Sequence, residues 1–534
     1  MKSNDVSSVA EATSTHLRIG PHDDLVESCV SAEFEAEAEG EGAGPSPTAE
    51  SLDAYLAVAI LGESVEERVK AAHKALKEAK GACGVANLIL AREGSADNKE
   101  ALEYAKKAVE QLKAECSDED FADYQVDAEA YTQAIADLAQ LNWNLGQKTE
   151  AVEIVTSFLH EYKDELPVEF KAIPRELAIS FLLQMGEIKA AQAMLQDETE
   201  NDEQWHYLNA LIHFALTGDD LISRSALSRA LMKGTLIAGA LTKDDENLHE
   251  TIIAFGLDRH VEDTAPAWNS VKGALAWLSD FLEQPLARHN RKLEEIAKAS
   301  GDLQRWKRWE DALESAQHFT EKNNEKEAKN SLKTALREAD RIDYTYFPFF
   351  ETVSILMEFS GGEKKALADL HSQIESRAKR FEADSTLGGP LNAMQLQACG
   401  TLFDFLQNYE ASLALHQKAS QLISDQVAKN EKNLTLVDEV DVRNELAGTL
   451  LAVDRFAEAL PLYLTNAEVL ERYLCPNHVE LLEMLEPAYR CLSGLGKEKE
   501  AEAMLEQINA IDPNYLEALA AADHDCDDCG HDHH

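Results

Sequence analysis

Two stretches of the sequence share one pattern, and this pattern decides the fold. Residues 450–459 are Leu-Leu-Ala-Val-Asp-Arg-Phe-Ala-Glu-Ala, and residues 492–501, 42 positions later, are Leu-Ser-Gly-Leu-Gly-Lys-Glu-Lys-Glu-Ala. The matched pairs are Leu450 with Leu492, Val453 with Leu495, Arg455 with Lys497, Glu458 with Glu500, Ala459 with Ala501 and Leu462 with Met504. Gly favours the positive φ of a helix end, and a small Ala lets two helices approach closely. The pattern therefore predicts helix hairpins.

Similar turns recur along the chain. Leu145-Gly146 precedes Glu150-Ala151, and Met185-Gly186 precedes Lys189-Ala190. Further second-helix starts are expected at Glu100-Ala101, Glu327-Ala328, Lys365-Ala366 and Glu410-Ala411. A single hairpin cannot bury its apolar stripe, so neighbouring hairpins stack. From Leu52 to about Asn514 we predict an all-α helical-repeat solenoid with disordered termini, against the alternative of a non-repeating helical bundle.

These spacings resemble tetratricopeptide repeats. Two parts of the chain have narrower resemblances. The first is carried by residues 67–76, 83–93, 225–234, 264–268 and 273–278, and the second by residues 440–506. Residues of about 55–280 resemble the "suppression of tumorigenicity" group of tetratricopeptide-like proteins. Residues of about 440–506 resemble the longer repeats of kinesin light chains, with Cys475-Pro476-Asn477 and His478 at a bend. The resemblance implies a groove that binds protein and implies no enzymatic chemistry.

The net charge of the chain limits its partners. There are 98 acidic and 50 basic residues among 534, which gives a formal net charge of −48. Such a surface repels nucleic-acid phosphates and anionic membrane faces, so we expect neither as a partner. No apolar run is long enough to span a membrane, and the first residues lack the apolar core of a secretory signal. Scattered cysteines suit a reducing compartment, so we expect a cytoplasmic protein.

Four regions follow from composition. Residues 1–50 carry eleven acids and two bases, with Glu33, Glu35, Glu37, Glu39 and Glu41 alternating with other residues. This segment has too few large apolar groups to offset its ordering entropy, so we predict that it is disordered. We then expect one tetratricopeptide-like array over 51–280, a second over 281–515, and a His/Cys/Asp-rich tail over 516–534.

The C-terminal tail is the densest chemical cluster of the sequence. Cys526 and Cys529 have the spacing that lets two thiolates bind one ion, and Gly530 eases the turn. Candidate histidine ligands are His524, His531, His533 and His534. Thiolate with imidazole favours zinc, with nickel or copper close behind. The tail resembles His/Cys-rich metal-binding tails in composition, and a solvated low-complexity tail or a redox dithiol are the alternatives.

The segment Arg305-Trp306-Lys307-Arg308-Trp309 is the most basic and aromatic part of an acidic chain. Trp306 and Trp309 lie at i and i+3, on one helix face. Core packing of both rings with solvated charges is the expected arrangement, and an interaction patch is the alternative.

The sequence contains no motif for nucleophilic, metal-assisted or phosphate chemistry. Gly494-Leu495-Gly496-Lys497-Glu498 lacks the Ser or Thr that a P-loop needs after its lysine. We therefore predict a non-catalytic scaffold that binds a basic or neutral peptide or helix in its groove, with a metal-binding tail. The alternative is a metal-handling chaperone or store whose tail carries the metal and whose repeats dock a client. An enzyme accessory subunit is a third possibility.

Overall fold

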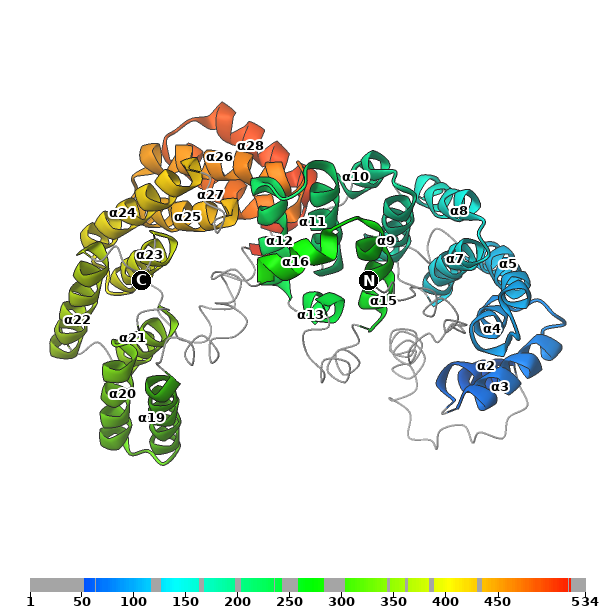
Figure 1. Ribbon diagram of the computed structural model, residues 1–534, viewed down its shortest axis with the longest axis horizontal. Coiled ribbons are helices and arrows are strands. Elements are labelled where there is room, and N and C mark those ends of the chain that lie inside the picture. Colours follow the sequence, from blue (N-terminus) through cyan, green and yellow to red (C-terminus); the bar gives the residue numbers. More distant parts are fainter. Residues whose placement is uncertain are drawn as a thin grey trace, which may run out of the picture. The chain divides into compact units, whose positions relative to one another are not determined.

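Most helices that follow one another within a compact part of the chain pack side by side, as the repeat pattern predicts (Figure 1). The computed structural model describes residues 52–62, 64–116, 126–162, 168–196, 203–234, 236–242, 258–282, 303–342, 346–360, 364–383, 389–429, 435–516 and 518–519. Every regular element in these ranges is a helix, so the all-α class is confirmed. The predicted disordered segment at residues 1–50 and the tail ligands lie outside the described residues.

The described helices fall into two compact units, residues 1–195 with 243–271 and residues 196–242 with 272–534. The first unit contains α2 Leu52–Leu61, α3 Val65–Glu78, α4 Gly84–Ile89, the π-helix η1 Leu90–Gly94, α5 Asn98–Glu115, α7 Val126–Asn144, α8 Lys148–Glu161, α9 Val168–Met185, α10 Ile188–Gln196 and α15 Asp258–Ser270. The predicted boundary at residue 280 lies beside residues 283–302, which are not described, and it stays a prediction.

The second unit begins with a hairpin and ends with the quoted repeats. It contains α11 Glu203–Thr217, α12 Leu221–Lys233, α13 Leu236–Thr242, α16 Ala274–Leu282, α19 Leu303–Glu321, α20 Glu325–Ala339, α21 Phe347–Ser360, α22 Lys364–Ala383, α23 Gly389–Phe405, α24 Tyr409–Ala428, α25 Leu436–Ala452, α26 Phe456–Tyr473, the short 3₁₀ helix η2 Val479–Leu481, α27 Leu482–Gly494 and α28 Glu498–Ile511. Within this unit, α12 also packs on α25 and α26, far along the chain.

The turn and contact residues of the hairpins take the predicted roles. Gly146, Gly186 and Gly496 have φ of +82°, +79° and +67°. The fourth residue of the second helix of a hairpin is a buried alanine in five cases. These are Ala101 of α5, Ala151 of α8, Ala328 of α20, Ala459 of α26 and Ala501 of α28.

Three predicted second-helix starts are off by one residue. In α22 and α24 the fourth positions are Leu367 and Ser412, and the predicted contact residues Ala366 and Ala411 are only partly buried.

The shift is clearest in α10. Ala190 of α10 is exposed, while Ala191, at the fourth position of that helix, is fully buried. The helix begins at Ile188, two residues after Gly186, so its fourth position falls on Ala191. The two adjacent alanines concealed this register in the sequence.

The aromatic segment of α19 belongs to the core. Trp306 and Trp309 are about 5% and 4% exposed, and the Trp309 indole donates to Thr352 Oγ1 at 2.9 Å. Arg308 extends outward and forms an ion pair with Glu338 at 3.0 Å. Core packing of the two rings, with charges on the outer side, is confirmed.

Candidate functional site

Helix α25 carries a line of carboxylates that we call the acidic face: Asp438, Asp441 and Glu445. They lie at i, i+3 and i+7, on one side of the helix. Thr435 caps the helix and forms a capping box with Asp438, whose Oδ2 accepts from the Thr435 N–H and Oγ1–H at 2.8 Å each. The Leu436 N–H donates to Ser225 Oγ of α12 at 2.9 Å, so a distant helix helps to hold the start of α25.

Asp441 stands out within the acidic face because its charge is poorly compensated. Burial, and next the Asp438 carboxylate, raise the pKa of Asp441 to about 7, while Arg229 opposes this rise. No hydrogen bond or ion pair reaches the half-buried Asp441 from the described part of the chain. A carboxylate in this position gains if a cationic group approaches it, because opposite charge favours the ionised form.

Two neighbouring groups complete the acidic face. Glu445 accepts a hydrogen bond from Thr401 Oγ1 of α23 at 2.9 Å. Burial and the nearby carboxylates of Asp441 and Glu445 raise the pKa of Tyr346, which precedes α21. The face therefore combines acceptors with a phenol, a set that suits the ammonium or guanidinium of a partner side chain.

Arg229 connects the acidic face to a buried ion cluster around Glu480. Its Nε donates to Glu480 Oε2 at 2.5 Å, and Lys233 Nζ lies 2.9 Å from Oε1. Burial alone would raise the pKa of Glu480, but the hydrogen bond from His206 and the positive charge of Arg229 hold it well below its usual range. The cluster joins α12 to η2 through side chains some 250 residues apart.

Two histidines close the ion cluster. His206 Nε2 lies 3.4 Å from Glu480 Oε1, and burial lowers the pKa of His206 against the influence of Glu480. His478 Nδ1 accepts from the Glu480 N–H at 3.2 Å, and burial lowers the pKa of His478 to about 3. The Trp205 ring covers His478, with 4.4 Å between the ring centroids. These neutral, fully buried rings are structural, so His478 at the predicted bend does not face a partner.

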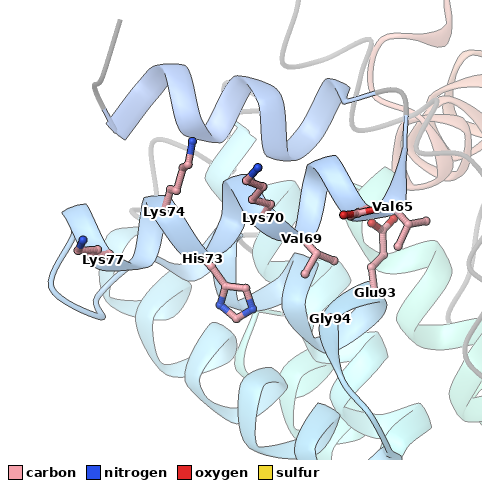
Figure 2. A pocket seen from close by; sticks show the side chains of 9 residues that line it. Val65, Val69, Lys70, His73, Lys74, Lys77, Glu93 and Gly94 are labelled. Carbon is pink, nitrogen blue, oxygen red and sulfur yellow. The ribbon is translucent and has the colours of Figure 1, made fainter. Parts of the chain in front are cut away.

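The other candidate site is an open pocket of about 840 Å³ in the first unit. We call it the basic pocket, because α3 lines it with Lys70, His73, Lys74 and Lys77. Figure 2 shows the lysines spread along α3, with Glu93 at the opposite end near Val65. Glu93 is engaged by Arg68 at 2.8 Å, and Glu66 also lines the pocket, so three lysines stand against two carboxylates in its lining.

The predicted metal ligands, Cys526, Cys529, His524, His531, His533 and His534, all lie outside the described residues. Zinc or nickel binding by the tail therefore stays a prediction. Among described side chains, no group of three or more His, Cys, Asp or Glu is arranged to hold a metal ion. Within the same ranges, no helix combines the length and apolarity needed to cross a membrane.

No family model matches the chain, and no curated protein matches it. Among solved structures, the chain is similar to the crystal structure of the APC/C hetero-tetramer Cut9-Hcn1. The two share 14% sequence identity over 87% of this chain and 94% of that chain, with a TM-score of 0.25. A likeness at this level carries no argument about partners, and the repeat architecture is evident in the helix hairpins of the chain itself.

Sequence reasoning missed both the acidic face and the ion cluster. The spacing of Asp438, Asp441 and Glu445 is visible in the sequence, but 98 acidic residues make many such spacings. The signal that distinguishes Asp441 is the proximity of Asp438 and Arg229, and Arg229 lies on a helix more than 200 residues away.

Proposed function

We propose that the chain is a non-catalytic interaction scaffold whose acidic face on α25 binds a basic segment of a partner protein. The observation that carries this proposal is Asp441, a half-buried carboxylate beside other carboxylates, with its pKa raised to about 7. Keeping such a charge costs stability, and residues that cost stability are concentrated at functional sites. A lysine or arginine of the partner would remove that cost.

The surroundings of the acidic face support this assignment. Helices stacked in hairpins generally present extended surfaces to a peptide or helix. Helix α12 packs on α25, and its Ser225 accepts from the Leu436 N–H at the start of α25. Arg229 of α12 is fixed by Glu480, so the carboxylates are held in place before a partner arrives. Preorganised charges lose less entropy on binding than flexible ones. The acidity of the whole chain would also speed the approach of a basic partner.

Affinity capture with the full chain tests the proposal. Asp441→Asn with Glu445→Gln keeps the side-chain shapes and removes two charges. The control, Glu458→Gln with Glu500→Gln, removes two exposed charges from second helices, where Glu458 pairs with Arg455 and Glu500 with Lys497. We expect a partner with a lysine- or arginine-rich segment to be lost from the first variant, with affinity falling about tenfold or more, and retained by the control. Equal capture by both variants would contradict the proposal.

A further inference from the structure

The basic pocket of α3 is an exception in an acidic chain. Lys70, Lys74 and Lys77 follow one another at i, i+4 and i+7, with His73 between them, and all four side chains are exposed. The acidic members of the lining are Glu66 and Glu93, and Arg68 forms an ion pair with Glu93. The pocket thus presents net positive charge in a protein whose formal charge is −48.

The chain enters the fold beside this pocket. Helices α2 and α3 pack together, and the Lys74 ammonium lies over the Tyr55 ring, 5.2 Å from its centroid. Tyr55 is on the first turn of α2, so the start of this helix lies near Lys74. Ten residues before Leu52 the sequence has a run of five glutamates in nine residues with no base among them: Glu33, Glu35, Glu37, Glu39 and Glu41.

The connecting chain is long enough to reach the pocket. Ten residues separate Glu41 from Leu52, and extended chain spans about 3.3–3.6 Å per residue, so the reach is about 35 Å. The fourteen residues of α3 are only about 21 Å long at about 1.5 Å per residue. Tethering over such a distance raises the effective concentration to about the millimolar range, which lets weak ion pairs act together.

We propose that the acidic stretch Glu33–Glu41 of this chain docks on the basic pocket of α3. The stretch then occupies the pocket within the same molecule. This contact is separate from the acidic face of α25, and each stands without the other.

Zero-length coupling of carboxylates to amines on the full chain, mapped by mass spectrometry, tests the proposal. We expect amide links from Glu33–Glu41 to Lys70, Lys74 and Lys77. Their yield should fall about tenfold when salt rises from about 0.1 M to about 1 M, because the Debye length shrinks from about 10 Å to about 3 Å. Changing all five glutamates to Gln should expose the three lysines to an amine-acylating reagent, with rates rising several-fold.

A matched variant controls for general loss of charge. Lys322→Gln, Lys326→Gln and Lys333→Gln remove three exposed lysines of the α19–α20 hairpin, and should leave the α3 links unchanged. Lys70→Gln, Lys74→Gln and Lys77→Gln should increase hydrogen exchange within residues 33–41. Links spread evenly over exposed lysines would overturn the proposal. Links joining differently isotope-labelled chains would overturn it in favour of a second copy, and unchanged lysine acylation in the glutamate variant would leave the pocket to an acidic partner.

Discussion

Arg229 of α12 donates its Nε–H to the carboxylate of Glu480 in η2, at 2.5 Å and across 251 positions of the chain. Lys233 and His206 approach the same carboxylate, which is about 1% exposed. Removing one member of a buried charge cluster leaves the others uncompensated, which costs about 3–5 kcal/mol. The acidic face depends on this cluster because Arg229 also lies near Asp441.

We therefore expect Glu480→Gln to destabilise the second unit by about 3–5 kcal/mol. Hydrogen exchange of α12 and α25 peptides in increasing denaturant measures the change. Glu500→Gln, which removes an exposed ion pair with Lys497, should change it by less than about 0.5 kcal/mol. A similar small effect for Glu480→Gln would mean that the cluster does not hold α12 to η2.

Acid should weaken the same region through its histidines. Burial lowers the pKa of His206, and lowers that of His478 to about 3. Below about pH 6.5 the unfolded chain therefore binds protons that the folded chain does not. The stability of the fold with respect to these histidines is complete above about pH 6.5 and is lost as pH falls toward 3. His478→Asn keeps an acceptor for the Glu480 N–H and should flatten the dependence of the unfolding midpoint between about pH 7 and pH 5. An unchanged slope would contradict this origin.

Asp441 should make stability depend on pH in the opposite direction to the histidines, and Asp441→Asn should reveal this. The pKa of Asp441 is raised to about 7, so its contribution to stability is complete below the unfolded value of 3.8 and is lost as pH rises through 7. Because the side chain keeps some solvent contact, we expect a gain of about 1–2 kcal/mol for the variant at about pH 8 and little gain at about pH 4. Denaturant unfolding at the two pH values measures it. A loss at pH 8 would show that Asp441 is already satisfied.

The 42-residue repeat gives a paired test of turn conformation. Asp454 and Gly496 occupy the same repeat position, and both have positive φ, 58° and 67°. Asp454→Gly should stabilise its turn and Gly496→Ala should destabilise its own, each by about 1 kcal/mol, because a Cβ is strained at positive φ. Thermal unfolding of both variants, with exposed Ala457→Gly in the first turn of α26 as a control for added chain entropy, checks the signs. If Asp454→Gly and Gly496→Ala changed stability in the same direction, the two turns would not be structurally equivalent.

The tail prediction is tested by titration. We expect zinc or nickel to bind the full chain, and binding to disappear in a version ending at Ala522. That version lacks all the proposed ligands: Cys526, Cys529, His524, His531, His533 and His534. Calorimetry measures both chains, and Cys526→Ser with Cys529→Ser separates thiolate ligands from histidines. Equal heats from the full and shortened chains would assign the metal to another site and end the proposal for the tail.

Local pattern was enough to predict the hairpins, their turn glycines and the burial of Trp306 and Trp309. These features depend on residues within a few turns of one another, which periodicity captures. The pairing of α12 with α25, α26 and η2 could not be predicted. Periodicity identifies the apolar face of a helix and not the distant helix that covers it, and Arg229 and Lys233 have the pattern of solvated charges.

The long separation between Arg229 and Glu480 has a consequence during synthesis. A ribosome adds about 5–20 residues per second, so Arg229 emerges roughly 12–50 s before its partner. Throughout that interval the α11–α12 hairpin lacks the carboxylate that neutralises it in the finished fold. The amino-terminal hairpin of this unit thus completes its structure only with the last repeats, unlike an array in which each repeat depends on its nearest neighbours alone.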